Sequence, residues 1–535
     1  MDASLLTMNS DVSCCSGRFG NFEILLEQIF VPAGVKEPVT AQYQLGIAVR
    51  SKAFPDEQQQ FIVPMAKLDS LDLEQLANGC IYESEQERRQ VSAYLRTQIP
   101  LLLAKGAIGQ YFPNTGWYPT PDHKYIYCAG KEILPCYSTD SLPAKTVCDA
   151  IHLAAPQNLD INDIAPQFLE SLWKHPGYRI PAFAYNIFSS LRSLWEEADL
   201  PFACSLLVVG KSGTGKTTLA KNFCQVYDDK LGQIADYYDV KGTKASMTDA
   251  LYEARDRTVL YDDICRSSDR ANQRSRLDNA VELIRFVANE AVKVKKVGRK
   301  NELRSSRAGL VITAEILPLE ISELSRCIVI SVEEPHIGGT NKDRILTAGL
   351  LRAYLSWFAE NIQSELENLR LEKEDFGQGE YPDLERLWVS TLQMNWCMES
   401  FWRFLESIPD CQDFLEEYPI DKVDKIFRQL FNHEVTLIHE IEQSCQPIEQ
   451  LILLGLSTGQ LPYRRHKGCY CVRFKDLLKF LRNITKNQAL SQRELSTYLH
   501  CHGLIQTDAS GRVSKKAGGA RYVFLKPDQL GNIQN

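Results

Sequence analysis

This chain of 535 residues lacks long apolar runs, because no stretch reaches 18 consecutive apolar residues. The sequence therefore predicts no membrane-spanning helix and no membrane partner. Its first residues, MDASLLTMNSDVSCC, also lack a basic region followed by an apolar segment, which is the pattern of a secretory signal peptide. No internal repeat or low-complexity segment is evident. These absences predict a cytoplasmic protein.

The 16 cysteines include no CxxC pair, so the ligand spacing typical of a zinc site is missing. Several of them, such as Cys204 and Cys327, lie in apolar, strand-like runs. Buried cysteines of a cytoplasmic protein stay reduced and pack as small apolar residues. We expect that role here rather than disulfide or metal chemistry.

Residues 206–223, LLVVGKSGTGKTTLAKNF, place a glycine-rich turn between a short apolar run and a helical pattern. The turn matches G-x-x-x-x-G-K-[ST] at every fixed position, in the strand–loop–helix context that this motif needs. In such a loop, backbone N–H groups surround the phosphates, the lysine reaches the β- and γ-phosphates, and the hydroxyl holds Mg²⁺. The sequence thus predicts ATP and Mg²⁺ as cofactors, with Lys216 as a catalytic residue and Thr217 as a metal ligand. The predicted nucleotide-binding residues are Gly210, Lys211, Ser212, Gly213, Thr214, Gly215, Lys216, Thr217 and Thr218.

Residues 257–264, RTVLYDDI, form an apolar strand pattern that ends in two aspartates. In phosphate-loop ATPases, a second strand brings one acid to Mg²⁺, and a neighbouring acid orients the attacking water. We expect Asp262 to serve the metal and Asp263 to activate water. An acidic pair that merely ends a strand is the alternative interpretation.

The next apolar strand, GLVITAEI (309–316), ends in Thr313 and Glu315. It is followed by ISELSRCIVISVEE, where Arg326 stands between a short helix and another apolar strand. This order resembles AAA+ ATPases, in which a polar sensor is followed by an arginine that reaches the neighbouring subunit. A fixed guanidinium there favours the negative charge that spreads over a transferred phosphoryl group. Thr313 and Arg326 are therefore predicted catalytic residues, although Arg326 taken alone reads as an ordinary surface arginine.

With these landmarks, the chain resembles the AAA+ helicases of mobile genetic elements and of primase-associated replication modules. The resemblance spans about residues 40–335 and implies ATP-driven movement of a ring on DNA. Two departures stand out: Asp262-Asp263 replaces the usual Asp-Glu, and Ala314 replaces a glycine. The stretches that carry the resemblance are NTGWYP (114–119), GKSGTGKTT (210–218), KGTKAS (241–246), VLYDDI (259–264) and VITAE (311–315).

Between the two ATPase strands lies VKVKKVGRKNELRSS (292–306), whose alternation and Gly-Arg turn predict a β-hairpin. Through residue 307 it carries seven lysines and arginines against one glutamate. In related ring helicases, a hairpin at this place projects into the central channel and follows a phosphate backbone. A solvated basic hairpin is the alternative. The predicted DNA contacts are Lys293, Lys295, Lys296, Arg299 and Lys300.

Positive charge also gathers at the C-terminal end, although the whole chain has a formal net charge of −8. From residue 463 to 526 there are 14 lysines and arginines against three acids. Two helical patterns, FKDLLKFLRNI and SQRELSTYLHCHGL, precede a predicted pair of strands around a basic, glycine-rich loop. This order predicts a winged helix that binds DNA, although many winged helices bind proteins. The predicted contacts are Arg493 to base edges and Arg512, Lys515, Lys516 and Arg521 to phosphates.

The chain is therefore expected to be α/β, with an AAA+ phosphate-loop core in which helices cover a parallel sheet. We expect an ATP hydrolase that works as a ring-forming DNA helicase or replication initiator-helicase of a mobile element. Its partners would be single-stranded or forked DNA, further copies in a hexamer, and primase or other replication proteins. The expected segments are a flexible tail (1–21), an N-terminal α+β domain (22–156), the ATPase core (157–335), a helical lid or linker (336–450) and the winged helix (451–535).

Two other functions remain open at this point. One is an oligomeric AAA+ ATPase switch in a bacterial defence or signalling module, which needs the same nucleotide site but no processive unwinding. The other is a small-molecule phosphotransferase, which has no use for the placement of Arg326 or for the basic hairpin.

Overall fold

The structure is a computed structural model in which the chain forms two compact units. One unit comprises Met1–Ile316 and Val329–Phe427, and the other comprises Leu317–Ile328 and Arg428–Asn535. The structure describes residues 17–33, 40–106, 108–120, 124–135, 144–146, 151–264, 270–289, 292–297, 300–315, 317, 321–335, 337–376, 384–445, 448–466, 468–484, 491–506, 515–517 and 520–527.

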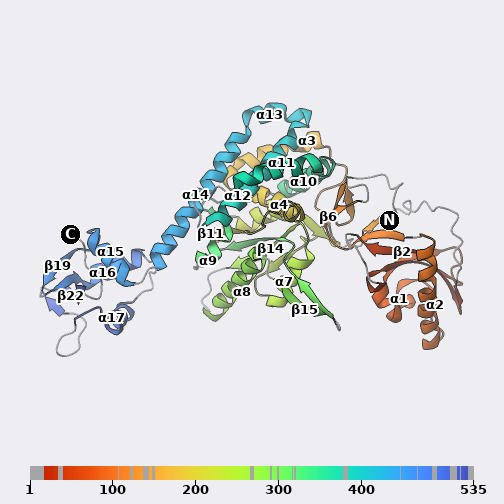
Figure 1. Cartoon of the computed structure of the whole chain (residues 1–535), viewed down its shortest axis with the longest axis horizontal. Coiled ribbons are helices and arrows are strands. Elements are labelled where there is room, and N and C mark those ends of the chain that lie inside the picture. The colour runs from red at the N-terminus through yellow and green to blue at the C-terminus, as the bar shows by residue number, and fades with distance from the viewer. Residues whose placement is uncertain are drawn as a thin grey trace. The chain divides into compact units, whose positions relative to one another are not determined.

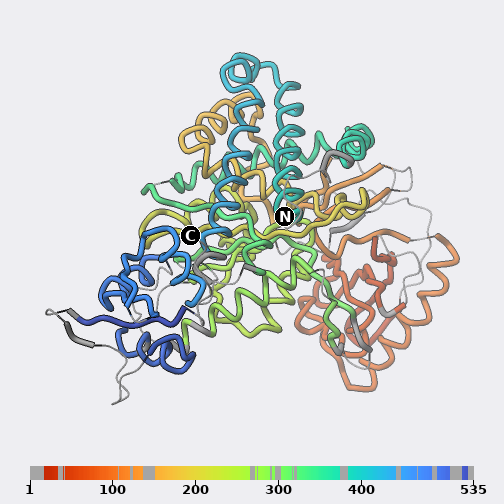
Figure 2. Tube along the Cα trace, turned by 60° about the vertical axis from the view of Figure 1, so that its left-hand side comes forward, coloured from red at the N-terminus to blue at the C-terminus, as the bar shows by residue number. Residues whose placement is uncertain are grey.

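The N-terminal region contains a mostly antiparallel sheet with strand order β4-β3-β2-β5-β9, with β1 paired to β2. Helix α2 (Glu85–Ala104) packs against β2 (Figure 2) and begins at Ser84, whose side chain accepts a hydrogen bond from the Glu87 amide. Its buried residues recur every three or four positions, which produces one apolar face. The other elements are β1 (Gly17–Phe19), β2 (Phe22–Pro32), β3 (Gln44–Ser51), β4 (Gln58–Pro64), α1 (Leu73–Leu76), β5 (Ile108–Phe112) and β9 (Ala144–Thr146).

Strand β1 corrects the expected tail, which was predicted to extend to residue 21. Gly17, Arg18 and Phe19 instead pair with β2 in an antiparallel register. The pairing gives the backbone N–H and C=O groups of this short segment hydrogen-bond partners on β2. Its three residues alone do not predict that pairing. Residues 1–16 of the predicted tail lie outside the described residues.

A second, three-stranded sheet is formed by β6 (Gly116–Pro119), β7 (Tyr125–Ala129) and β8 (Glu132–Leu134). It contains the NTGWYP element that contributed to the family resemblance. Trp117 and Tyr127 are buried and meet edge to face, with ring centroids 5.1 Å apart. Further along the chain, β10 (Ile151–Leu153) pairs with β12 (Tyr227–Asp229).

The core is a five-stranded sheet with order β13-β14-β17-β11-β18, and its pairs β13–β14, β14–β17 and β11–β17 are parallel. Helix α4 (Pro176–Ser190) lies on one side, and α7 (Lys244–Glu253) and α8 (Arg270–Ala288) lie on the other (Figure 1). The α/β phosphate-loop core expected from the sequence is present. Its strands are β11 (Ser205–Gly210), β13 (Tyr237–Asp239), β14 (Thr258–Ile264), β17 (Gly309–Ala314) and β18 (Cys327–Val332).

Helix α4 begins with Pro176 in its first turn and is followed by the separate helix α5 (Arg192–Glu197). Nearly every side chain from Arg179 to Ser190 is buried. A helix that is buried on all sides has no polar face, so its sequence shows only a weak amphipathic pattern. The first residue of such a helix is therefore difficult to predict from the sequence.

Two of the helices that follow the core in the chain pack onto it. Helix α10 (Asn341–Glu360) packs on α3 (Ile161–Lys174), and α12 (Glu385–Glu406) packs on α4. A capping box between Thr340 and Asp343 starts α10. The remaining helices are α11 (Ile362–Phe376), α13 (Gln412–Glu417) and α14 (Ile420–Cys445). Within the described residues, no helix is both long enough and apolar enough to span a membrane.

The C-terminal region has three helices and a four-stranded sheet with order β19-β20-β22-β21. The sequence predicted only a two-stranded hairpin after the helices. The additional hairpin β19–β20 precedes α16, and residue 505 makes only an isolated bridge to Leu525. Gly468, with φ of +78°, provides the turn between β19 and β20. The elements are α15 (Ile448–Ser457), β19 (Tyr463–His466), β20 (Cys469–Arg473), α16 (Phe474–Ile484), α17 (Gln492–Cys501), β21 (Lys515–Ala517) and β22 (Ala520–Leu525).

Candidate functional site

The predicted phosphate loop connects β11 to α6 (Lys216–Leu219), which continues as one π-helical turn to Cys224. Gly213 and Gly215 have φ of +81° and +90°. Only glycine adopts such values without strain, so the motif requires glycine at position 215 because of the backbone conformation there. The loop thereby leads directly into the helix that carries Lys216 and Thr217.

The side chain of Lys216 is buried and turns back over the loop. Its Nζ donates a hydrogen bond to the Lys211 carbonyl, 2.8 Å away. Burial lowers the pKa of Lys216, while the nearby carboxylates of Glu315, Asp262 and Asp263 act in the opposite direction. The ammonium group is therefore held among acids at the mouth of the loop.

A β-bulge brings the two predicted acids to the same place. The register between β14 and β17 shifts between Tyr261 and Ile264, which is the position of Asp262 and Asp263. In a regular strand, consecutive side chains point to opposite faces, but a bulge redirects one of them. Asp263 has φ of +76°, an uncommon value for a residue other than glycine. Backbone strain of this kind is typical of functional sites.

Asp262 accepts hydrogen bonds from three hydroxyl groups on three different elements. Thr217 donates to its Oδ1 over 2.8 Å, and Thr313 donates to the same oxygen. Tyr237 of β13 donates to Oδ2 over 2.7 Å. Thr217 and Asp262 together offer a hydroxyl and a carboxylate oxygen, which are the donors that Mg²⁺ prefers. These two residues therefore fit the metal that the motif implies.

Asp263 is held by a partner that the sequence analysis did not identify. Arg276 of α8 forms an ion pair with Asp263 Oδ2 at 3.0 Å and also donates to the Asp263 carbonyl at 2.7 Å. The amide of Asp263 donates to the hydroxyl of Thr313 at 3.3 Å. Half of the Asp263 side chain remains exposed. The carboxylate is thus oriented but still accessible.

Lys216, Thr217, Asp262, Asp263 and Thr313 line one pocket of about 370 Å³. Gly210, Lys211 and Thr214 complete the loop outside this lining. Tyr237 and Arg276 were missed because no local spacing connects them to the motifs; they meet the acids only in the folded chain. The lining residues are Ser212, Gly213, Gly215, Lys216, Thr217, Thr218, Asp262, Asp263, Ile264, Thr313, Ala314 and Glu315.

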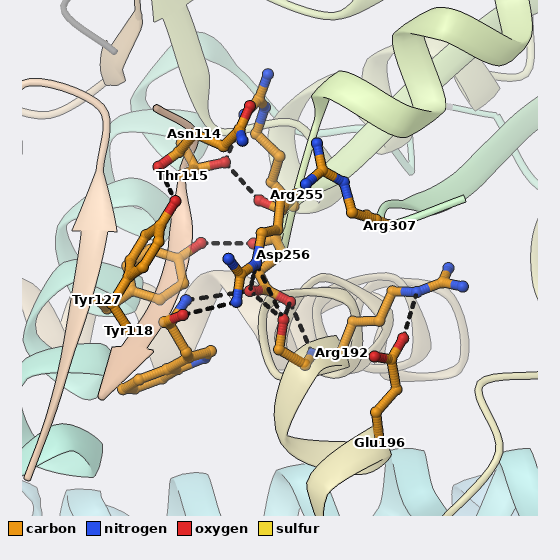
Figure 3. Close-up of polar contacts among 12 residues, drawn as sticks. Asn114, Thr115, Tyr118, Tyr127, Arg192, Glu196, Arg255, Asp256 and Arg307 are labelled. Atoms are coloured by element: carbon orange, nitrogen blue, oxygen red, sulfur yellow. Dashed lines mark hydrogen bonds and ion pairs between the residues drawn. The ribbon is translucent and has the colours of Figure 1, made fainter. Parts of the chain in front are cut away.

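The NTGWYP element binds the segment just before β14 (Figure 3). Asp256 is completely buried, and its carboxylate accepts hydrogen bonds from the amides of Trp117 and Ser193 at 3.1 and 2.7 Å. Arg255 donates to the Trp117 carbonyl at 2.8 Å and lies over the Tyr118 ring. The three-stranded sheet is therefore tied to the beginning of the strand that ends in Asp262 and Asp263.

Glycine is required at position 116 for this contact. Its φ is +110°, and a Cβ atom there would lie 2.2 Å from Asp256 Oδ2. Any larger side chain would displace the buried carboxylate. Both the close packing and the positive φ therefore require glycine at this position.

The predicted hairpin is present as β15 (Lys293–Val297) and β16 (Lys300–Arg304), paired antiparallel. Two of its predicted DNA-binding lysines have acidic partners on the core. Lys293 pairs with Glu282 of α8 at 2.6 Å, and Lys295 pairs with Asp249 of α7. The hydrogen bond from Lys293 lowers the pKa of the Glu282 carboxyl. Of the other predicted contacts, Arg299 lies outside the described residues, and only the backbone is described at Lys296 and Lys300.

The root of the hairpin is anchored to the end of α7. The ring of Tyr252 has the guanidinium groups of Arg304 and Arg307 over it, 4.6 and 4.1 Å from its centroid. Arg307 also donates through Nε to the Tyr252 carbonyl at 2.7 Å, and its own carbonyl accepts from the Asp256 amide at 3.0 Å. The hairpin root, the root of β14 and the start of β17 thus form one connected network.

Arg326 follows α9 (Ile321–Leu324) and precedes β18, as the sequence indicated. Its Nη1 donates to the Ser322 carbonyl of the same helical turn. Its predicted contact with a neighbouring subunit stays a prediction.

The predicted C-terminal contacts are distributed over a helix and two strands. Arg493 is exposed on α17, and Arg521 is exposed at the start of β22. Lys515 and Lys516 lie in β21, where they pair with residues 522 and 521, and only their backbone is described. Arg512 lies outside the described residues. Their contact with DNA stays a prediction.

Residues 206–313 match the family model described as RNA helicase. No curated protein matches the chain. The solved structure "SCCmec type IV Cch - active helicase" matches at a TM-score of 0.55 and 14% identity, covering 95% of this chain and 95% of that chain. The resemblance to helicases that the motifs indicated is thus confirmed for the segment 206–313 and for the fold.

Two further solved structures match more weakly. A JCV helicase matches at a TM-score of 0.22 and 15% identity, over 44% of this chain and 73% of that chain. The C-terminal region of NrS-1 matches at a TM-score of 0.25 and 10% identity, over 90% of this chain and 94% of that chain. Both TM-scores are below 0.5, so neither match adds to the argument.

Proposed function

We propose that this protein is an ATP-dependent DNA helicase of the AAA+ type that works as a hexameric ring in the cytoplasm, in the replication of a mobile element. One observation supports this proposal above the others. The phosphate loop, its lysine and the two acids meet in one pocket, and the strands that carry the acids and Thr313 begin at the root of a basic hairpin.

In the proposed mechanism, Lys216 leaves the Lys211 carbonyl and pairs with the phosphates of ATP, whose cleavage supplies the free energy. Thr217 and Asp262 would hold Mg²⁺, which would neutralise charge on the phosphates. Asp263 orients the attacking water, and Arg276 fixes the carboxylate in that orientation. Thr313 contacts both aspartates, so it registers a change at either one.

The connection from pocket to hairpin is short. Strand β17 runs from Gly309 to Ala314, so Thr313 lies roughly 13 Å along the strand from its start at Gly309, which closely follows the hairpin root. Strand β14 runs beside it in a parallel register. A displacement at the acids is therefore transmitted along two paired strands to Asp256 and Arg307, which hold the root.

In this proposal the hairpin lysines exchange the carboxylates of Glu282 and Asp249 for the phosphates of a DNA strand. Arg326 reaches the nucleotide of the neighbouring subunit, and the C-terminal region binds DNA through Arg493 and the basic strands. Primase or other replication proteins are proposed partners of the N-terminal region.

The proposal is tested by ATP hydrolysis and by strand separation on a forked DNA substrate. The wild-type protein should hydrolyse ATP faster when single-stranded or forked DNA is added and should unwind the fork. Lys216→Ala should do neither, whereas Lys67→Ala, which changes an exposed lysine of the N-terminal region, should retain both activities. ATP hydrolysis that is indifferent to DNA, together with no unwinding, would contradict the helicase.

The ion pairs of Lys293 and Lys295 favour one second candidate, an oligomeric ATP switch in a defence or signalling module. In such a switch, the acids keep the hairpin against the core, and no strand is translocated. The double variant Lys293→Ala/Lys295→Ala distinguishes the two functions. A helicase loses unwinding, whereas a switch keeps its nucleotide-dependent oligomerisation, measured by light scattering, and has no unwinding to lose.

A further inference from the structure

The C-terminal sheet has two chemically different faces. Side chains alternate across a strand, and the paired register carries each face across β19, β20 and β22. One face is apolar and buried against the core that α15, α16 and α17 complete. Its residues are Tyr470, Val472, Val523 and Leu525.

The opposite face, here called the outer face, combines rings and positive charge. His466 of β19 and Phe524 of β22 have ring centroids 5.9 Å apart. Arg473 of β20 pairs with Tyr522 of β22 in the register, and its Nε donates to the Tyr522 hydroxyl at 3.3 Å. Arg464 occupies the same face of β19, opposite Cys471. Arg464, His466 and Arg473 are exposed, and the two aromatic rings are half-buried.

We propose that this outer face binds single-stranded nucleic acid by stacking bases on Tyr522 and Phe524, while Arg464 and Arg473 contact the phosphates. Proteins that bind single strands combine a basic surface with aromatic rings, because every base presents a π-face. Strand β19 contains two arginines, β20 and β22 contain one each, and none of the three strands contains an acid. The positive charge of these strands therefore complements a polyanion.

The stacking groups favour a single strand over a duplex. In a duplex the base faces are covered by their neighbours, and the grooves expose only base edges. Rings on a sheet face therefore have little to contact in a duplex but can stack on unpaired bases. The hydrogen bond from Arg473 keeps the Tyr522 ring beside the guanidinium, so that one base and its phosphate can be held together.

This inference rests on the proposed action on nucleic acid but does not depend on the nucleotide pocket. The DNA contacts predicted from the sequence lie on α17 and near the β21–β22 hairpin, whereas the outer face takes a strand that is already separated. The face therefore provides a second binding surface on the same C-terminal region.

The test uses full-length protein carrying Lys216→Ala, so that ATP hydrolysis does not contribute. Fluorescence anisotropy measures binding of four probes: a 20-mer of deoxythymidine, an abasic 20-mer, a 20-mer of uridine and a blunt 20-base-pair duplex. Tyr522→Leu/Phe524→Leu should weaken binding of the deoxythymidine strand by tenfold or more, since each stacked base contributes about 1–3 kcal/mol. Binding of the abasic strand and of the duplex should change little. The uridine strand shows whether the face accepts RNA as well as DNA, and either result is compatible with stacking.

Phe54→Leu is the control, because Phe54 is an exposed aromatic residue, 46% accessible, in the turn between β3 and β4. It should leave all four affinities unchanged. A second variant, Arg464→Ala, removes one exposed charge and leaves the hydrogen bond from Arg473 to Tyr522 in place. It should weaken binding of the deoxythymidine and abasic strands alike and reduce the salt dependence of log K by about 0.7, the value for one lost phosphate contact.

Equal affinities of wild-type protein and the Leu double variant for the deoxythymidine strand would overturn the inference, provided that both unfold at the same temperature. A Leu variant that unfolds early is replaced by the arginine variant, whose unchanged salt dependence would overturn it equally. Failure of the proposed function has a different signature, because DNA-stimulated ATP hydrolysis by the chain with Lys216 intact would then be missing while strand binding persists.

Discussion

The nucleotide pocket and the β15–β16 hairpin differ in what their predicted groups contact. In the pocket, Lys216, Thr217 and Asp262 line one cavity, and the hydrogen bond from Thr217 to Asp262 joins two predicted residues. In the hairpin, Lys293 and Lys295 face carboxylates of α8 and α7 that no motif includes. When the residues of a motif are close in sequence or at the ends of neighbouring strands, the motif itself predicts how they are arranged. The contacts of a series of charged residues depend instead on which partners the fold places beside them.

The largest expected effect comes from removing the lysine of the nucleotide pocket. Lys216→Ala should reduce ATP turnover by at least about 100-fold, because a cation aimed at developing phosphate charge contributes about 3 kcal/mol. Steady-state hydrolysis measures this loss, and a tryptophan-monitored unfolding curve shows whether the variant folds. Turnover within a few fold of wild type would contradict the assignment of the loop.

The next effect concerns the root that pocket and hairpin share. Gly116→Ala should destabilise the protein by about 2–4 kcal/mol, because it combines an unfavourable φ with a Cβ that meets the buried Asp256 carboxylate. Urea unfolding measures the change. Gly177→Ala is the matched control, since this glycine lies in α4 with open space around its Cβ position, and it should be neutral or slightly stabilising. Equal stabilities of the two variants would show that the NTGWYP contact does not brace β14.

Within the pocket, Arg276→Ala should lower the turnover number about tenfold while leaving the KM for ATP nearly unchanged, because it removes the group that orients Asp263. The steady-state rate as a function of ATP concentration separates the two parameters. The effect should vanish when Arg276→Ala is added to Asp263→Asn, since residues that act through one another are not additive. Full additivity would assign Arg276 another role.

The smallest expected effect concerns the acids that pair with the hairpin lysines. Asp249→Asn/Glu282→Gln should raise the affinity for single-stranded DNA about threefold, because exposed or partly exposed ion pairs contribute about 0–1 kcal/mol each and the lysines no longer have to leave them. Anisotropy titrations at low salt measure this gain. Unchanged or weaker binding would mean that the two lysines do not contact the strand.

Much of this architecture could be predicted from local patterns. The apolar run before Gly210, the acids after β14 and the short helix before Arg326 all follow from spacing and strand signals. The bulge at Asp262 could not be predicted, because a register shift depends on the neighbouring strand. The partners Tyr237 and Arg276 lie on β13 and α8, 25 and 13 residues from the acids they contact, and only the packing of these elements brings them there. Strand β19 was missed because its arginines dominate a segment of only four residues.

The clamp on the Tyr252 ring limits how the hairpin can move. With two guanidinium groups over one ring and a backbone bond to its carbonyl, the base of the hairpin resists bending, so the pair of strands swings as a stiff arm. An arm of about 15 Å that turns by roughly 12° carries its far end through about 3 Å. That distance is close to the rise per nucleotide of one strand along the helix axis of DNA, about 3.4 Å. In the proposed helicase, a rotation this slight is enough for the arm to advance by a single nucleotide.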